Sequence, residues 1–361
     1  MTRLRIGVIG AGHLGRIHAK LLGQVDGAEL VAISDPFDDA RQRAETQFGV
    51  PTFADHRSLI NRIDAAVIAA PTDQHAEIAT DLLKAGKHVL AEKPLATSAA
   101  DSDRLAMLAA ARRLTLQVGH VERFNPAFTA LEHLGVDVKF VEAVRASRFP
   151  GRCLDVGVVM DLMIHDIDLV CSMTEAPVVS VSASGLAVVS DHEDLAEARL
   201  EFGCGLIAQL KASRVSPAPA RSMHVYGANG FAEIDFSAPA IHAVRPSDSL
   251  AERNFELESE TENPLTYADE LFENHLQLET LSVEPRNAIL DELHDFVISI
   301  QSGIAPTVDG YAGARAVTIA EKILDAVAKR SWYEQPGVHE VGPRALRRTR
   351  IDAPQRIRRA A

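Results

Sequence analysis

The chain has 361 residues, a formal net charge of −13 and an apolar content of 47%. This length exceeds what one hydrophobic core usually supports, and the composition is that of an ordinary globular protein, so we expect two folded domains. The acidic balance argues against nucleic acid or an anionic membrane as the main partner, and no apolar run approaches the roughly 18 residues that span a bilayer.

Short apolar runs alternate with segments of helical period through the first third of the chain. This alternation is typical of a parallel sheet covered by helices. Strands are expected at residues 4–9, 30–34, 65–69, 88–91 and 115–118, with helices beginning near His13, Ala40, Gln74 and Ser98. Asp73 and Thr97 are the expected N-caps of the last two helices. These elements predict an α/β fold, with a doubly wound Rossmann domain over residues 1–122.

The pattern changes after about Val121, where runs of strands replace the alternation. Helices are expected at residues 126–134, 159–173, 287–301 and 312–328, and strands at 138–147, 178–186, 196–202, 206–213, 223–226 and 231–235. Residues 245–285 are acidic and polar with little periodicity, which predicts a loop. We expect a second α/β domain over residues 123–335, with a large, mostly antiparallel open sheet, and a basic, flexible tail over 336–361.

A glycine-rich turn directly follows the first expected strand. It reads Gly10-Ala11-Gly12-His13-Leu14-Gly15, the G-x-G-x-x-G fingerprint of dinucleotide-binding domains. The first glycine permits a tight turn, the second lets the backbone approach the pyrophosphate, and the third allows close packing of the helix. We expect Gly10, Gly12, His13, Leu14 and Gly15 to contact the cofactor, because the helix N-terminus favours phosphate.

Asp35 ends the second expected strand, 20 residues after Gly15. A carboxylate at this place can accept hydrogen bonds from both adenosine ribose hydroxyls, whereas a 2′-phosphate would meet like charge. No basic residue directly follows, because Pro36 and Phe37 come next. The predicted cofactor is therefore NAD rather than NADP. The alternative is that Asp35 only begins the Asp35-Pro36 turn.

Glu92-Lys93-Pro94 follows the fourth expected strand, and ligands in open α/β sheets bind beyond the carboxyl ends of the strands. Lys93 could point its ammonium at a substrate oxygen there and stabilise negative charge as a hydroxyl becomes a carbonyl. Considered alone, Lys93 is better explained as an ordinary exposed loop lysine.

The apolar helix expected over 159–173 carries Asp161, His165 and Asp168 on one face. Three interpretations remain open. The residues could form a hydrogen-bonded Asp/His pair inside the core, a metal site, since i, i+4 spacing suits two ligands, or a catalytic base. A histidine that titrates near neutrality can accept a hydroxyl proton as hydride leaves the same carbon.

Together these segments resemble the glucose-fructose oxidoreductase, inositol dehydrogenase and rhizopine catabolism (Gfo/Idh/MocA) family. The resemblance is carried by residues 6–15, by Ala70-Pro71-Thr72 with His75, by Glu92-Lys93-Pro94, and by Asp161 with His165. It implies a sugar oxidoreductase in which Lys93 polarises the substrate, His165 is the acid/base and Asp161 is the orienting carboxylate. It also implies cofactor contacts from Pro71, Thr72, His75, Glu92 and Lys93, and a homodimer or homotetramer formed through the second sheet.

Two further stretches, Gly119–Pro126 and Phe149–Arg152, resemble family members that act on nucleotide-linked amino sugars such as UDP-N-acetylglucosamine. Substrate contacts are accordingly expected from Arg123, Asn125, Arg148, Arg152, Asp161 and His165. Arginine suits a diphosphate because its planar guanidinium can donate two parallel hydrogen bonds, and surface pairing with acids is the alternative. Met163 stands where the family commonly has a small residue, a departure from the polyol dehydrogenase pattern.

The favoured function is NAD-dependent oxidation of a sugar hydroxyl to a ketone, or the reverse, on a nucleotide-linked amino sugar such as UDP-N-acetylglucosamine. The alternatives are a dehydrogenase of inositol or another free polyol, a glycosidase that uses transient NAD oxidation, and a non-catalytic NAD-binding regulator. A regulator would tolerate loss of Lys93 or His165, so the presence of both favours an enzyme.

Cys153, Cys171 and Cys204 lie far apart and include no C-x-x-C pair, so neither zinc binding nor redox exchange is expected and no metal site is predicted. Their odd number fits a reducing compartment. Glycine and charge interrupt the first nine residues too early for the apolar core of a signal peptide. We expect a cytoplasmic protein that is neither exported nor membrane-spanning.

Overall fold

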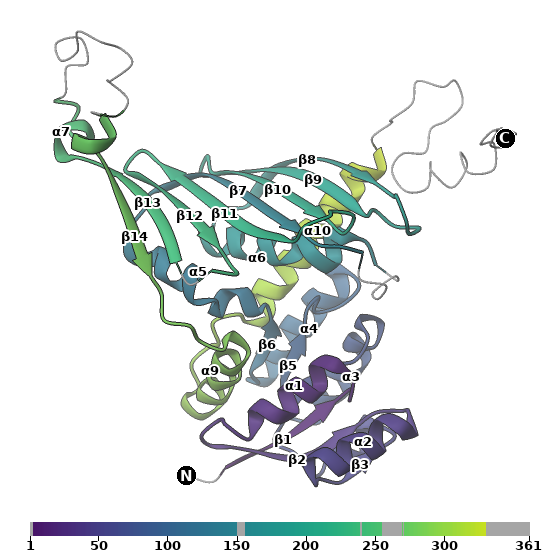
Figure 1. Cartoon of the computed structure of the whole chain (residues 1–361). Coiled ribbons are helices and arrows are strands. Elements are labelled where there is room, and N and C mark those ends of the chain that lie inside the picture. The colour runs from purple at the N-terminus through teal and green to yellow at the C-terminus, as the bar shows by residue number, and fades with distance from the viewer. Residues whose placement is uncertain (1–2, 150–155, 239, 255–268, 270, 330–361) are drawn as a thin grey trace, which may run out of the picture.

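Two sheets, each with its own helices, make up the computed structural model, which describes residues 3–149, 156–238, 240–254, 269 and 271–329. The lower sheet in Figure 1 has six parallel strands in the order β3-β2-β1-β4-β5-β6. Its strands are β1 (Leu4–Ile9), β2 (Ala28–Ser34), β3 (Thr52–Phe53), β4 (Ala65–Ile68), β5 (His88–Glu92) and β6 (Leu116–Gly119). Its helices are α1 (His13–Leu22), α2 (Asp38–Phe48), α3 (Thr72–Lys84) and α4 (Ala99–Arg112). The expected Rossmann fold is confirmed.

This sheet is apolar on both faces because helices cover both. Ala66 and Ile68 of β4 pack in one core with residues of α3 and α4, whereas Ala65 and Val67 pack in another core with α1 and α2. The strand order reverses between β1 and β4. At such a switch point the loops after the strands separate and leave a crevice, which is where these folds bind ligands.

The second sheet has eight strands in the order β14-β13-β12-β11-β7-β10-β9-β8, and all its pairs are antiparallel except β7 with β10. The mostly antiparallel open sheet is therefore confirmed. Its strands are β7 (Val138–Ala146), β8 (Val178–Leu186), β9 (Leu195–Phe202), β10 (Ile207–Ser213), β11 (Ala220–Gly227), β12 (Gly230–Asp235), β13 (Ala240–Pro246) and β14 (Leu276–Ser282).

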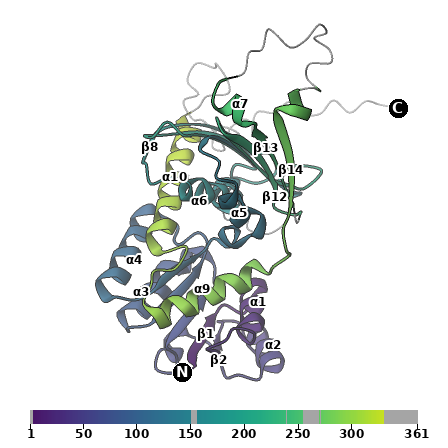
Figure 2. The ribbon, with the colours of Figure 1, turned by 90° about the vertical axis from the view of Figure 1, so that its left-hand side faces the viewer.

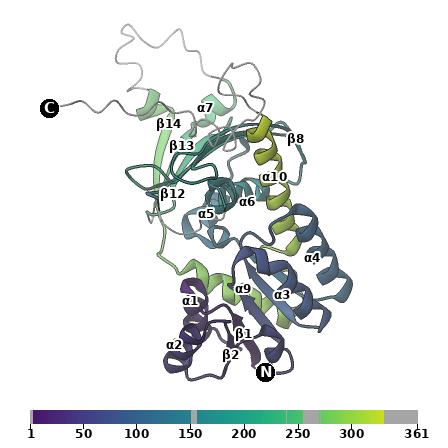
Figure 3. The same cartoon turned by 90° about the vertical axis from the view of Figure 1, so that its right-hand side faces the viewer.

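Three helices lie on the face of this sheet that is turned toward the Rossmann sheet: α5 (Pro126–Leu131), α6 (Ile164–Ser172) and α10 (Gly310–Lys329) (Figures 1 and 3). Together with the inner face of the sheet they form one large apolar core. A short π-helical segment, η4 (Val159–Met163), leads into α6. The helix that carries the predicted catalytic residues is therefore held between the two sheets.

The chain returns to the Rossmann sheet near its C-terminal end. Helix α9 (Ala288–Ser302) lies beside α1 (Figure 2), and its Leu293, Phe296 and Val297 belong to the same core as β1 and α1. The amide of Val118 in β6 then donates to the carbonyl of Val308 at 3.0 Å. These contacts join the end of the chain to the sheet that begins it.

Three expectations about local structure were wrong. Residues 245–285 are not a loop throughout, because they contain α7 (Asp248–Ala251) and β14. The N-cap residues of α3 and α4 are Pro71 and Ser98, not Asp73 and Thr97, and the Ser98 hydroxyl accepts from the amide of Asp101.

The expected tail over 336–361 lies outside the described residues. Among the residues described, no helix is both long and apolar enough to cross a bilayer.

Candidate active site

The three glycines of the fingerprint are needed for different reasons. Gly10 has φ +97°, and a Cβ there would lie 2.4 Å from the carbonyl oxygen of Ala69, so only glycine fits. A Cβ on Gly15 would lie 1.8 Å from the carbonyl oxygen of Gly10. A Cβ on Gly12, by contrast, would meet nothing within 4 Å. Gly12 therefore leaves open surface at the N-terminus of α1, where a pyrophosphate would be received.

A cleft of about 730 Å³ opens along this turn. Ala40 and Arg43 of α2 and residues 54–57 after β3 line part of it. Four further segments line the rest: the glycine turn with His13 and Leu14, the loop after β2 with Asp35, the loop after β4 with Pro71, and α3 with Gln74. All four lie at the carboxyl ends of the strands, on both sides of the switch point. Their shape and chemistry fit a dinucleotide.

Asp35 lies at the edge of the cleft and is almost fully buried. Its carboxylate accepts from the amide of Ala11 at 2.8 Å and from the amide of Phe37 at 2.9 Å. The bond from Phe37 forms the Asp35-Pro36 turn, which was the alternative role considered for Asp35. The bond from Ala11 fixes the glycine loop against β2. Each oxygen retains a lone pair, so these bonds leave Asp35 able to accept from a ribose hydroxyl as well.

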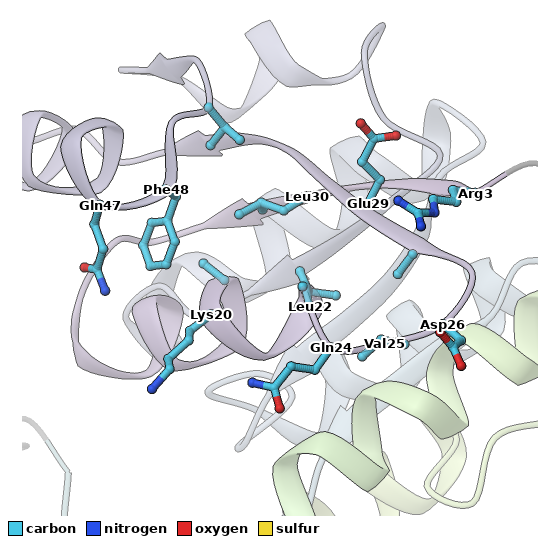
Figure 4. Close-up of a pocket in the computed structure, with 14 residues that line it drawn as sticks. Arg3, Lys20, Leu22, Gln24, Val25, Asp26, Glu29, Leu30, Gln47 and Phe48 are labelled. Atoms are coloured by element: carbon cyan, nitrogen blue, oxygen red, sulfur yellow. The ribbon is translucent and has the colours of Figure 1, made fainter.

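A second hollow, of about 560 Å³, lies at the opposite ends of the Rossmann strands from the cleft. Figure 4 shows the residues that line it. It is bordered by Lys20 of α1, Gln24 just after α1, Glu29 near the start of β2, and Phe48 at the end of α2. None of the predicted site residues lines it. Because it lies at the amino ends of the strands, it is not where an open α/β sheet binds its ligand.

His75 does not line the cleft, although the resemblance implies a cofactor contact for it. The ring is buried, with Nδ1 2.9 Å from the carbonyl oxygen of Pro94 and Nε2 2.9 Å from that of Ala70. It therefore ties the loop after β4 to the loop after β5. Thr72 begins α3 beside Pro71, directly after the cleft-lining turn.

Glu92 ends β5 and pairs with a histidine that the sequence did not single out. His18 of α1 is fully buried, and its Nε2 lies 2.7 Å from Oε1 of Glu92. Burial opposes ionisation of Glu92, but the hydrogen bond and charge of His18 and the charge of Lys93 outweigh it and lower the pKa of Glu92. An ionised Glu92 thus lies next to the predicted catalytic lysine.

Lys93 is joined to the second half of the chain. Its Nζ donates to the backbone carbonyl oxygen of Asp161 at 2.6 Å and to Oδ1 of the same residue at 3.2 Å. Both side chains are mostly buried, with 16% and 19% exposed. The lysine is therefore not an exposed loop residue, and Asp161 orients it.

His165 lies on α6, one turn after Asp161, and is half-buried. The Nδ1 atom of its ring is buried without a hydrogen-bond partner among the described residues. Burial, together with the charges of Lys93 and Arg145, holds the pKa of His165 well below its ordinary value. The ring is therefore neutral at neutral pH and can accept a proton. The core pairing of Asp161 with His165 is not observed.

A buried ionic network beneath α6 was not predicted. Arg145 of β7 donates from Nη2 to Asp166 at 2.8 Å and from Nη1 to Glu122 at 2.9 Å, and Arg221 of β11 also pairs with Glu122. Removing one partner of such a buried pair typically costs about 3–5 kcal/mol. The network fixes α6, and hence His165, against β7 and the segment after β6.

The residues expected to bind substrate have diverse surroundings. Arg123, in the short helix η2 (Val121–Phe124), donates to Asp168 of α6 at 3.1 Å. Asn125 caps α5 through the amide of Ala127 and donates to Glu122, which accounts for much of its hydrogen-bonding capacity. Arg148 is exposed and donates to the carbonyl oxygen of Pro217 at 2.8 Å. Arg152 lies outside the described residues.

A buried carboxylate holds the start of the helical segment that carries the predicted catalytic residues. Glu193, just before β9, accepts from the amide of Val159 at 3.2 Å, and its own carbonyl accepts from the amide of Val158 at 2.9 Å. Gly157 packs directly on this carboxylate, since a Cβ there would lie 1.9 Å from Oε1 of Glu193. These contacts fix the turn from which Asp161 and His165 project.

His120, which follows β6, was also not singled out, although it lies within the quoted stretch Gly119–Pro126. It is fully buried, and its ring lies against that of His165. Its position directly after a strand of the parallel sheet is the signal that could have identified it. Within the described ranges, no group of three or more His, Cys, Asp or Glu side chains could hold a metal ion.

Known proteins are similar to this chain both in sequence and in fold. A family described as "Oxidoreductase family, NAD-binding Rossmann fold" matches residues 4–120, and one described as "GFO/IDH/MocA C-terminal domain" matches residues 136–233. The UDP-N-acetylglucosamine 3-dehydrogenase of Acidithiobacillus ferrooxidans is 32% identical over 328 residues, covering 91% of this chain and 98% of its own. The myo-inositol 2-dehydrogenase of Thermotoga maritima is 29% identical over 355 residues, covering 93% and 98%.

A solved structure of the Acidithiobacillus ferrooxidans enzyme superimposes with a TM-score of 0.79 at 31% identity, covering 90% of this chain and 98% of that chain. A probable dehydrogenase from Thermotoga maritima gives a TM-score of 0.71 at 26% identity, covering 90% and 96%. The similarity extends over both sheets and includes the helix between them. The chain therefore belongs to the Gfo/Idh/MocA family of oxidoreductases.

Proposed function

We propose that this oxidoreductase uses NAD to oxidise a hydroxyl of a nucleotide-linked amino sugar such as UDP-N-acetylglucosamine to a ketone, or catalyses the reverse reaction. One observation carries the chemistry: Lys93, at the carboxyl end of the Rossmann sheet, is held by Asp161 one helical turn before the neutral His165. A fixed ammonium and a neutral imidazole are the two groups that alcohol oxidation requires.

The chain's own residues supply the acid/base steps. Nε2 of His165 accepts the hydroxyl proton, and the ammonium of Lys93 stabilises the charge that develops on the oxygen. Asp161 keeps that ammonium in place. The glycine turn and Asp35 would hold NAD in the cleft, and its nicotinamide would supply the hydride acceptor. In the reverse direction His165 returns the proton.

The assignment to NAD rests on Asp35. Its carboxylate closes the cleft at the end of β2, where the adenosine ribose of a dinucleotide is received. Negative charge there favours ribose hydroxyls and disfavours a 2′-phosphate.

Two observations support a nucleotide sugar. The similar enzyme from Acidithiobacillus ferrooxidans, matched over nearly its whole length, acts on UDP-N-acetylglucosamine by name. Arg148 is exposed after β7, near the start of the segment that leads to the catalytic helix, where it is accessible to a diphosphate. The myo-inositol 2-dehydrogenase relative supports a free polyol as the second candidate.

Ligand-dependent melting in the presence of NAD separates these substrates. UDP-N-acetylglucosamine should raise the melting temperature, and myo-inositol should not. Arg148→Ala and Arg152→Ala should each weaken nucleotide-sugar binding by roughly tenfold while leaving NAD binding within a few fold. Arg104→Ala is the matched control, because Arg104 is an exposed arginine on α4 that pairs with Asp101. Stabilisation by myo-inositol alone would favour the polyol candidate.

A further inference from the structure

His120, which is fully buried, and His165, which is half-buried, form a pair of adjacent imidazole rings near Lys93. The ring centroids lie 6.2 Å apart and the ring planes are nearly perpendicular, at 88°. Among the described residues, neither ring nitrogen of His120 has a hydrogen-bond partner, nor does Nδ1 of His165. His120 is 0% exposed. Three buried nitrogens on two adjacent rings thus need a partner that the described side chains do not supply.

Leaving such a group unpaired costs about 1–3 kcal/mol, and proteins usually satisfy it with an ordered water. A water that bonds to two nitrogens holds them about 4.5 Å apart, since each bond is about 2.8 Å long and the angle at the water is close to tetrahedral. This span suits two rings whose centroids are 6.2 Å apart. A single water between the rings can satisfy one nitrogen of each.

The chemistry of His165 makes this contact important. A neutral imidazole carries one proton, so Nε2 is free to accept the substrate proton only if that proton sits on Nδ1. A buried Nδ1–H needs an acceptor, as a carboxylate provides in hydrolytic triads. Asp161 bonds to Lys93 instead, and no carboxylate in the described part of the chain bonds to His165.

We propose that His120 is a positioning residue for His165. Through one buried water, which accepts from the Nδ1–H of His165 and donates to a ring nitrogen of His120, it keeps His165 in the tautomer whose Nε2 can take the substrate proton. The proposal rests on the proposed acid/base role of His165.

The charges around His120 agree with an acceptor role. Burial lowers the pKa of His120, while Asp168 of α6 raises it and Lys93 after β5 lowers it. Arg123 of η2 lowers it further, and Glu92 of β5 raises it. His165 faces Lys93, Arg145 and Arg221 as well as His120. Both rings are therefore neutral near neutral pH, and a neutral His120 has one bare nitrogen that can accept a hydrogen bond.

Nitrogen-15 NMR of the full-length protein labelled at histidine tests the tautomer without substrate or cofactor. The His165 signals are assigned by their loss in His165→Ala. We expect wild-type His165 to be protonated at Nδ1 and bare at Nε2 at pH 7. In His120→Phe, which keeps a ring but removes both nitrogens, this preference should be lost. In His120→Gln, whose amide can accept the same bond, it should be largely retained.

Kinetics provide the second readout. His120→Phe should lower kcat by roughly 10–100-fold, the usual effect of losing a group that orients another, with KM and NAD affinity within a few fold. His120→Gln should recover most of the loss. His133→Phe is the matched control and should behave as wild type, because His133 is an exposed histidine in the short helix Glu132–Leu134.

Wild-type His165 protonated at Nε2 would overturn the proposal, even if His120→Phe fails to fold. An unchanged tautomer and kcat in a folded His120→Phe would also overturn it. Failure of the proposed function is a different result: His165→Ala would then retain hydride transfer, whatever the tautomer of the wild-type ring.

Discussion

Lys93 and Asp161 lie 68 residues apart in the chain and are joined by two hydrogen bonds, from Nζ of Lys93 to the backbone oxygen and to Oδ1 of Asp161. One residue follows β5 of the Rossmann sheet, and the other lies in η4 under the second sheet. The contact therefore sets the position of the proposed acid/base helix relative to the cofactor cleft. Small displacements of reacting groups can cost about 10²-fold in rate, so this contact should matter for turnover.

Lys93→Met and His165→Ala should each lower turnover by roughly 10²–10⁴-fold, because charge stabilisation and acid/base catalysis have that scale. NAD affinity should stay within a few fold, since neither side chain lines the cleft beside the glycine turn. Single-turnover kinetics with bound NAD measure the chemical step. Lys139→Met is the matched control, because Lys139 is a surface lysine paired with Asp137. Near-normal hydride transfer in either active-site variant would refute its assigned role.

NAD should bind at least about tenfold more tightly than NADP, because a 2′-phosphate beside Asp35 should cost about 1.4 kcal/mol or more. Asp35→Ser should reduce this difference in affinity between NAD and NADP. It should also weaken NAD binding, since the amide of Ala11 then loses the acceptor that fixes the glycine loop. Fluorescence titration with both cofactors measures these affinities. Equal affinities in the wild-type protein would mean that Asp35 serves the loop alone.

Gly157→Ala should impair both stability and turnover, because its Cβ would lie 1.9 Å from Oε1 of Glu193. Overpacking of this kind typically costs about 1–3 kcal/mol. Gly203→Ala is the control, since the nearest atom to its Cβ would be 3.6 Å away, an ordinary contact. Urea unfolding and kcat are the measurements. If Gly157→Ala and Gly203→Ala have the same stability and the same kcat, Glu193 does not fix the start of the helix.

The pH dependence of stability should reveal His165. Burial lowers its pKa in the folded protein, so the unfolded chain takes up the proton first as the pH falls below the ordinary value of 6.5. Stability from this group is therefore present above pH 6.5 and lost on acidification. Between pH 6.5 and 5.5 wild type should lose more stability than His165→Gln does. Parallel losses in urea melts of the two proteins would indicate an unshifted His165.

The features that could be predicted from sequence are local ones. The glycine turn and Lys93 each follow a short apolar strand, and parallel strands bring their carboxyl ends to one edge. The bond from Lys93 to Asp161 has no local signature, since it depends on how two sheets pack. The same holds for Arg145, whose partners Glu122 and Asp166 come from other elements.

Two other features could not be predicted from the sequence: the direction of a side chain and the presence of an edge strand. A histidine near the start of α3 can face the cleft or the interior, and only packing decides that His75 bonds the carbonyls of Ala70 and Pro94. Strand β14 forms the edge of its sheet and is mostly exposed. Its polar residues therefore break the alternation that marks half-buried strands, which is why a loop was expected there.

NADH formation in a single turnover with UDP-N-acetylglucosamine tests the central claim most directly. Wild-type protein with bound NAD should produce NADH with this substrate and none with myo-inositol. Lys93→Met should slow the single-turnover formation of NADH at least about 10²-fold. The account is contradicted if myo-inositol is oxidised readily while UDP-N-acetylglucosamine neither binds nor yields NADH.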